Sequence, residues 1–266
     1  HKETPIKLED TGISLKSVSF SYDGTTEVLH DANLAIHPGT MTALVGPSGS
    51  GKSTVAKLIA GYWDVTSGSI TLGGHELKDM PLSEIADQIS YVSQDNYLFN
   101  RSIRENIRMG RPSATDAEVE QAAKQSGCDA FIRKMDSGYD TVVGGAGSHL
   151  SSGECQRIAS ARAILKNAPV VILDEATAFT DPQNEDKIQK SIMALSKGKT
   201  LLVIAHRLST IQNADQIVVL KKGQIVDCGK QEELLERCPL YADMWQAHIG
   251  AKNWSVGEKK EVAVNV

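Results

Sequence analysis

The chain has 266 residues, 41% of them hydrophobic, which is enough for one large core or for a core with a small subdomain. Its 28 basic and 33 acidic residues give a net charge of −5 (28 − 33), and basic blocks are limited to Lys221-Lys222 and Lys259-Lys260, so nucleic-acid binding gains no support. The apolar runs fall far short of the roughly 18–20 residues that cross a bilayer, and the four cysteines lack CxxC spacing. We therefore expect a chain that does not itself span a membrane and that fits a reducing, cytosolic setting.

The predicted elements begin with a sheet and a buried strand. Three strand-like segments separated by turn signals predict an antiparallel sheet at residues 13–22, 28–36 and 69–72. Between the second and third segments, the apolar run at residues 41–45 predicts a buried strand, and a helix is predicted at residues 54–60.

The rest of the chain combines apolar strands with helical patterns. Nearly all-apolar strands, typical of a parallel sheet buried on both faces, are predicted at residues 168–173, 200–204 and 216–220. Before them, helical patterns dominate, at residues 102–108, 115–125 and 152–165.

The sequence therefore predicts an α/β fold, with an N-terminal antiparallel β subdomain and an inserted α-helical subdomain. The phosphate-loop pattern G-x-x-x-x-G-K-[ST] at residues 46–53 further predicts that the parallel-sheet core is that of a P-loop NTPase. The predicted division is a core at residues 1–94 plus 162–250, a helical subdomain at 95–161 and a flexible C-terminal tail at 251–266.

The segment GPSGSGKS at residues 46–53 fits the phosphate-loop pattern G-x-x-x-x-G-K-[ST], and it stands between a predicted strand and a predicted helix, as such a loop must. Its glycines let backbone N–H groups and the helix dipole point at phosphate oxygens. Lys52 would neutralise phosphate charge and Ser53 would bind Mg²⁺. We expect a nucleoside triphosphate to contact Gly46, Ser48, Gly49, Ser50, Gly51, Lys52, Ser53 and Thr54.

A second motif is the apolar strand that ends in Asp174 and Glu175. Carboxylates at the C-terminal edge of a strand lie where α/β sheets bind ligands. Asp174 would hold Mg²⁺, directly or through water, and Glu175 would polarise the water that attacks the terminal phosphate.

The segment LSSGE at residues 150–154 resembles the LSGGQ signature of ABC-type ATPases, and the order of all the motifs over about residues 12–249 is similar to that family. The resemblance implies ATP as the nucleotide. It also implies that Tyr22 stacks on adenine, that Ser151 and Gly153 of the signature contact ATP, and that Asp181 belongs to the D-loop at the nucleotide. Gln94, similar to the glutamine-loop residue, is implied in catalysis and Mg²⁺ binding, and His206 is implied as the catalytic switch histidine.

Residues 97–107 are similar to the exporter type of this family, which usually carries a membrane domain in the same polypeptide. The resemblance implies a head-to-tail dimer with a second nucleotide-binding domain, in which each ATP lies between one loop and the other signature. It further implies transmembrane domains as partners, a place at the cytoplasmic face of the plasma membrane, and ATP hydrolysis that drives transport. Departures from the family pattern are Gly145, Ser152, Glu154 and Phe179.

Two other functions fit parts of the pattern. One is a nucleotide-binding clamp of a heterodimeric transporter that hydrolyses ATP negligibly, against which Glu175 and His206 both count. The other is a soluble ABC ATPase of an importer, of DNA repair or of translation, against which the exporter-like segment counts.

Overall fold

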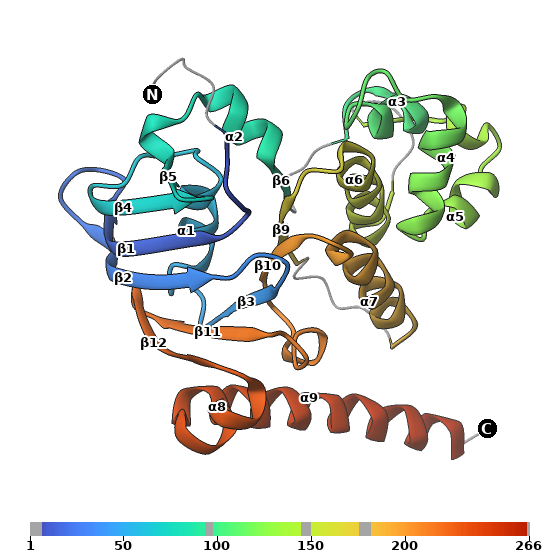
Figure 1. Cartoon of the computed structure of the whole chain (residues 1–266). Helices are drawn as coiled ribbons and strands as arrows, with labels where there is room; N and C mark the ends of the chain where they lie inside the picture. Colours follow the sequence, from blue (N-terminus) through green and yellow to red (C-terminus); the bar gives the residue numbers. More distant parts are fainter. Residues whose placement is uncertain (1–6, 94–97, 145–149, 176–181, 265–266) are drawn as a thin grey trace.

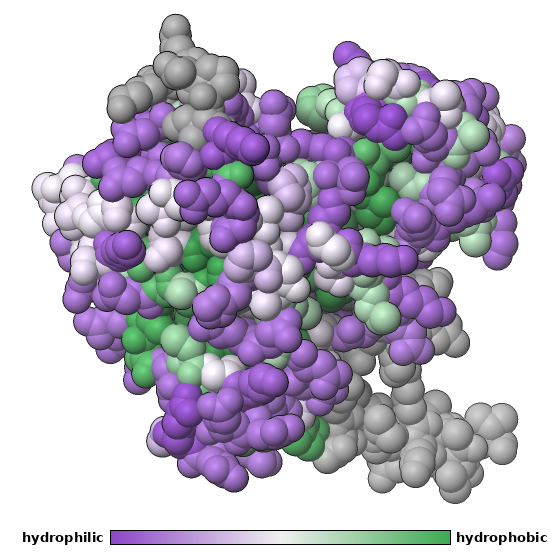
Figure 2. Space-filling model, in the orientation of Figure 1, coloured by the Kyte–Doolittle hydropathy of each residue, from purple (hydrophilic) through white to green (hydrophobic). Residues whose placement is uncertain are grey.

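The computed structural model of the chain describes residues 7–93, 98–144, 150–175 and 182–264. An antiparallel sheet and a mostly parallel sheet lie together, a helical part extends from them, and the last helices run along one side (Figure 1). The face seen in Figure 2 is largely hydrophilic. The predicted α/β class is confirmed.

The antiparallel sheet has the strand order β2-β1-β4-β5, with β1 (Ile13–Ser21), β2 (Glu27–Ile36), β4 (Ser67–Leu72) and β5 (His75–Glu76). A bulge interrupts β1 at Ser17, which has a φ of 48°. The bulge shifts the buried face from Ile13 and Leu15 to Val18 and Phe20, because one extra residue reverses the alternation of a strand.

The second sheet has the order β12-β11-β3-β10-β9-β6, and all neighbours are parallel except β11 and β12. Lys222 and Gly223 join that hairpin with positive φ values of 48° and 76°, as a type I′ turn requires. The strands are β3 (Met41–Val45), β6 (Ile89–Val92), β9 (Val170–Asp174), β10 (Thr200–Ile204), β11 (Gln216–Lys221) and β12 (Gln224–Gly229).

Two cores cover the parallel sheet, one on each face. The first joins it to the antiparallel sheet and to α1 (Lys52–Ile59) and α2 (Leu82–Gln88). The second lies under the helices α6 (Ser152–Lys166), α7 (Pro182–Ser196), α8 (Gln231–Arg237) and α9 (Pro239–Val264). Burial on both faces explains why the strands β3, β9 and β10 are nearly all apolar.

The helical part has a core of its own, to which α6 contributes Ile158, Ala161 and Leu165. Its other elements are α3 (Ile103–Arg108), α4 (Asp116–Gln125), α5 (Asp129–Arg133) and the short strands β7 (Arg101–Ser102) and β8 (Val142–Val143). Short 3-10 helices occur at Leu77–Asp79, Gly138–Asp140 and Leu208–Thr210. The predicted boundary at 161/162 therefore falls inside α6, which serves both parts.

The helix α9 continues to Val264, through most of the segment 251–266 for which a flexible tail is predicted. Helix formation needs no new nucleus there, since the segment extends a helix already packed through the fully buried Tyr241. Its alanine, lysine and glutamate residues also favour helix. None of the helices in the described ranges combines the length and apolar content needed to cross a bilayer.

Candidate nucleotide-binding site

The phosphate loop lies between β3 and α1 and is shaped by glycines. Gly51 has a φ of 104° directly before α1, a conformation that side chains disfavour. At Gly46, an added Cβ would lie 2.2 Å from the carbonyl oxygen of Leu220 and 2.7 Å from Oγ of Ser50. The loop therefore packs against β11 so closely that only glycine fits at residue 46.

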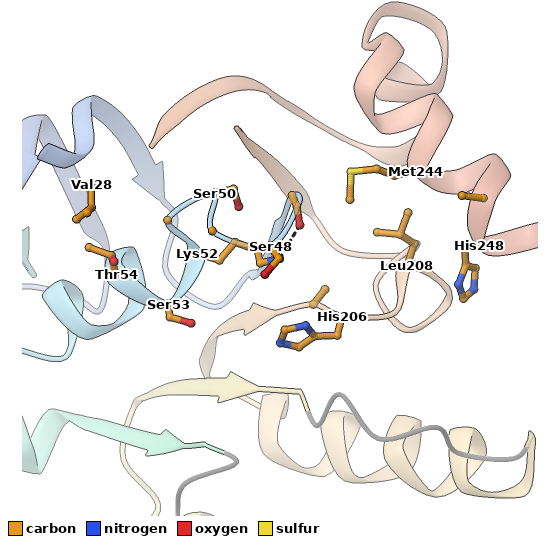
Figure 3. Close-up of a pocket in the computed structure, with 15 residues that line it drawn as sticks. Val28, Ser48, Ser50, Lys52, Ser53, Thr54, His206, Leu208, Met244 and His248 are labelled. Carbon is orange, nitrogen blue, oxygen red and sulfur yellow. Dashed lines mark hydrogen bonds between the residues drawn. The ribbon is translucent and has the colours of Figure 1, made fainter. Parts of the chain in front are cut away.

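The loop forms one wall of a cavity of about 790 Å³ (Figure 3). All eight residues predicted to contact the phosphates line this cavity. Across from them lie residues that follow β10, and α9 supplies a third side. The remaining lining residues are Val28, Ala205, His206, Leu208, Met244, Ala247 and His248.

Polar groups in the loop are arranged to meet an anion. Lys52 Nζ donates a hydrogen bond of 2.6 Å to the carbonyl oxygen of Gly46, so the ammonium is folded back over the loop. Burial lowers the pKa of Lys52, and Asp174 opposes that shift. Oγ of Ser50 is buried and has no hydrogen-bond partner within the described part of the chain. Phosphate oxygens would satisfy both groups.

Asp174 and His206 approach each other at the edge of the parallel sheet. His206 Nε2 lies 3.2 Å from Oδ1 of Asp174, and both side chains are partly exposed. His206 points into the cavity opposite the loop (Figure 3). The structure thus brings together the predicted switch histidine, the predicted metal ligand and the phosphate loop.

Glu175 is only 3% exposed and does not line the cavity. Its carboxylate accepts hydrogen bonds from the backbone N–H of His206 at 3.0 Å and of Arg207 at 3.2 Å, and from the hydroxyl of Thr210. Burial raises the pKa of Glu175, although these hydrogen bonds oppose the rise. The segment after β10 therefore holds the predicted base.

Mg²⁺ fits the donors present near the loop. Ser53 is an exposed residue on the cavity wall, and Asp174 stands at the end of β9, which is separated by β10 from the strand that leads into the loop. No group of three or more His, Cys, Asp or Glu side chains gathers as a metal site in the described ranges. Two protein oxygens suit an ion that is held mainly by nucleotide phosphates and water.

Tyr22 is 47% exposed and is linked to the loop through Thr54. Its hydroxyl lies 3.0 Å from Oγ1 of Thr54, in the first turn of α1. The Tyr22 ring makes edge-to-face contacts with Phe20 and Trp63. The aromatic residue predicted to stack on the base therefore lies beside the predicted phosphate site.

The signature residues lie apart from this cavity, at the start of α6. Ser151 caps that helix: its hydroxyl accepts from the backbone N–H of Glu154 at 3.1 Å, and Glu154 Oε1 accepts from the backbone N–H of Ser151 at 2.9 Å. Neither Ser151 nor Gly153 lines the cavity. The predicted site residues Gln94 and Asp181 lie outside the described residues, as do Gly145 and Phe179.

Sequence reasoning missed Thr210, Trp63 and the three α9 residues that line the cavity, Met244, Ala247 and His248. Thr210 has no motif spacing that marks it, and its role follows only from its hydrogen bond to Glu175. Trp63 gave a weak signal, as a large aromatic residue in a turn after the loop helix. The α9 residues reach the cavity only because that helix packs on the core of the parallel sheet, which no local sequence pattern indicates.

Comparison with known proteins places these motifs in a family. Residues 29–178 match the family described as ABC transporter. A putative multidrug export ATP-binding/permease protein of Staphylococcus aureus is 46% identical over 242 residues, which cover 91% of this chain and 42% of that protein. An ATP-dependent lipid A-core flippase of Syntrophus aciditrophicus is 46% identical over 247 residues, which cover 93% of this chain and 41% of that protein.

The fold agrees with that of a solved relative. A bacterial Atm1-family ABC exporter with ATP bound matches this structure with a TM-score of 0.87 at 38% identity, over 93% of this chain and 43% of that one. The chain spans less than half the length of each of these relatives. The resemblance drawn from the motifs is confirmed, and the fold is that of an ABC exporter nucleotide-binding domain. The chain belongs to the ABC transporter family.

Proposed function

We propose that the chain is the ATP-binding and ATP-hydrolysing domain of an ABC exporter. The observation that carries this proposal is the cavity in which the phosphate-loop residues other than Pro47 face His206. Lys52, the loop amides and the N-terminus of α1 would hold the triphosphate, and Tyr22 would stack on adenine. Mg²⁺ held by Ser53 and Asp174, with Gln94 as a further ligand, would neutralise charge on the phosphate oxygens.

Glu175 would act as the base for the attacking water. Its raised pKa makes it a stronger base than an exposed glutamate. The water oxygen forms a bond to the terminal phosphorus as the bond to the ADP oxygen breaks, and Glu175 accepts a proton from the water. His206 and Gln94 would orient the reacting groups. Because the amides of His206 and Arg207 hold the Glu175 carboxylate, the segment after β10 sets the position of the base.

The signature supports a head-to-tail dimer. Ser151 and Gly153 begin a 15-residue helix whose N-terminus favours anions, yet they do not line the cavity of their own chain. A second nucleotide-binding domain would bring its own signature, with Asp181 nearby, to the phosphates bound here. ATP would then join the two domains, and its cleavage would separate them.

The relatives' names support the wider assignment. They are a multidrug export ATP-binding/permease protein and a lipid A-core flippase, and each is more than twice as long as the matched region. We infer that this chain acts with transmembrane domains at the cytoplasmic face of the plasma membrane, where opening and closing of the dimer drives transport. Because these relatives are named as an export protein and a flippase, they also count against the assignment of this chain as a soluble ATPase of an importer or of repair.

The rate of phosphate release, measured against protein concentration, tests this function and separates it from a clamp. If two chains form each site, the turnover rate per chain in saturating Mg-ATP should rise with protein concentration until the dimer is saturated. A constant rate per chain would contradict the composite site. Binding of ATP with no release at any concentration would favour the clamp.

A further inference from the structure

Trp63 contacts the residue that is predicted to stack on adenine, although it belongs to none of the motifs described above. The ring centroids of Trp63 and Tyr22 lie 5.3 Å apart with the planes at 88°. Phe20 contacts the same Tyr22 ring, at 4.7 Å and 85°. Both are edge-to-face pairs at favourable separations. The Tyr22 ring is therefore held by two aromatic neighbours at nearly right angles to it.

The turn that carries Trp63 is fixed to β1. The backbone N–H of Thr66 donates to the carbonyl oxygen of Ser19 at 3.0 Å, and Oγ1 of Thr66 accepts from the backbone N–H of Ser21 at 3.1 Å. On the other side, the backbone N–H of Tyr62 donates to the carbonyl oxygen of Lys57 in α1 at 3.0 Å. The position of Trp63 is thus set relative to both the end of β1 and the loop helix.

Trp63 differs from the other two partners of Tyr22. Phe20 is 3% exposed and belongs to the core beneath the antiparallel sheet, whereas Thr54 belongs to the loop helix and binds the Tyr22 hydroxyl. Trp63 is 49% exposed, so burial alone does not account for a tryptophan at this turn. Tyr22 still keeps 47% of its surface exposed and available to a base.

We propose that Trp63 is a positioning residue for the nucleotide base, which holds the Tyr22 ring in the orientation that stacks on adenine. The inference rests on the proposed ATP site. A ring that is already oriented loses less conformational freedom when the base binds, so Trp63 should strengthen ATP binding without contacting the phosphates. Without Trp63, Tyr22 would keep its contacts with Phe20 and Thr54 and would lose one of its two edge-to-face contacts.

The test compares the binding of Mg-ATP with that of inorganic tripolyphosphate and Mg²⁺, a probe that has phosphates and no base. Trp63→Leu should weaken ATP binding about threefold to tenfold, as expected for one edge-to-face pair, and should leave tripolyphosphate binding unchanged. Trp63→Phe should stay within about twofold of wild type, because it keeps an aromatic partner. Thermal melting of each variant checks the fold.

Tyr62→Leu is the matched control. Tyr62 is the adjacent residue and is 59% exposed, but its ring contacts Tyr91 at 5.5 Å rather than Tyr22. This variant should bind ATP as the wild type does. In a Tyr22→Ala background, Trp63→Leu should cause no further loss of ATP affinity, because the ring that it orients is gone.

The outcomes separate this inference from the proposed function. If Tyr22→Ala weakens ATP binding and Trp63→Leu does not, the positioning role is wrong and the base site stands. Equal losses for ATP and tripolyphosphate in Trp63→Leu would indicate a merely structural role and would overturn the inference. If Tyr22→Ala itself leaves ATP affinity unchanged, base stacking at Tyr22 is wrong, and the role of Trp63 falls with it.

Discussion

The hydroxyl of Thr210 donates a hydrogen bond to the carboxylate of Glu175, the residue proposed as the catalytic base. Glu175 is 3% exposed, and burial raises its pKa, whereas the bond from Thr210 lowers it. The pKa of Glu175 is therefore raised by burial and lowered by hydrogen bonds from Thr210 and from the backbone of His206 and Arg207, and the bond from Thr210 can be removed by a single substitution.

Thr210→Val removes this hydrogen bond with little change in shape, so the pKa of Glu175 should rise further. A base acts in its ionised form, and activity is lost as the pH falls through its pKa. The acidic limb of the profile of kcat against pH should therefore move to higher pH in Thr210→Val. Thr210→Ser keeps the hydroxyl and should keep the wild-type profile. If the acidic limb is unchanged in Thr210→Val, the group whose titration controls turnover is not Glu175.

Lys52→Met should weaken ATP binding and stop turnover without harming the fold. Charge-assisted hydrogen bonds to phosphate are worth about 1.5–3 kcal/mol each, so affinity should fall at least about tenfold and turnover should stop. Burial lowers the pKa of Lys52, which means that its charge is poorly solvated in the folded loop. The nucleotide-free variant should therefore melt at or above the wild-type temperature. Wild-type ATP affinity in Lys52→Met would contradict the site.

Glu154→Gln should strengthen the contact of the signature with ATP. Glutamine keeps the oxygen that accepts from the backbone N–H of Ser151, so the cap of α6 survives. The substitution removes a negative charge from a helix N-terminus that is proposed to face phosphates. Hydrolysis should therefore reach half of its maximal rate at a lower protein concentration than in wild type. A shift in the opposite direction would contradict this placement of the signature.

The buried Asn106 side chain joins several segments of the helical part through hydrogen bonds, and removing it should destabilise the domain. At 0% exposure, its Nδ2 donates to the carbonyl oxygens of Phe99, Arg101 and Ser102, and its Oδ1 accepts from Arg162 and from the backbone N–H of Phe99. A buried polar group left without a hydrogen-bond partner costs about 1–3 kcal/mol. Asn106→Ala should therefore lower the free energy of unfolding by at least about 2 kcal/mol.

Denaturant unfolding checks the Asn106 prediction. The control is Asn33→Ala, which removes an exposed amide whose oxygen accepts a hydrogen bond from the backbone N–H of Ser17. Water can replace that bond, so the loss should be about 1 kcal/mol or less. Similar losses in both variants would show that burial of Asn106 adds nothing.

Much of the fold follows from local sequence. The phosphate loop was predicted together with β3 and the helix after it, because the motif, the apolar strand and the helix are contiguous. The sequence does not predict strand β6, because two of its four residues, Ser90 and Tyr91, carry hydroxyl groups and no turn signal separates the strand from α2. The bulge at Ser17 was invisible too, since pairing with two neighbouring strands fixes it.

The site was predictable to the extent that its residues share a motif. The loop residues and His206 meet at one cavity as the motif order suggests. The orientation of Glu175 was not predictable, because it depends on backbone amides at residues 206 and 207 and on a hydroxyl at residue 210, more than thirty positions away. The contact of Trp63 with Tyr22 likewise depends on how two separate turns pack.

The central claim is that ATP joins two copies of this domain and that Glu175 is needed to cleave it. Glu175→Gln leaves Lys52, Ser53 and Tyr22 in place, so ATP binding should survive, whereas loss of a positioned base should slow cleavage by about 10²- to 10⁴-fold. Uncleaved ATP should hold the variant as a dimer, while hydrolysis keeps dissolving the dimers of the wild type.

The measurement is size-exclusion chromatography with light scattering on both proteins in saturating Mg-ATP, together with phosphate release. We expect Glu175→Gln to have the mass of a dimer and to release almost no phosphate, and the wild type to be mostly monomeric. A Glu175→Gln protein that stays monomeric with ATP bound and hydrolyses it within a few-fold of the wild-type rate would contradict both the role of Glu175 and the ATP-joined dimer.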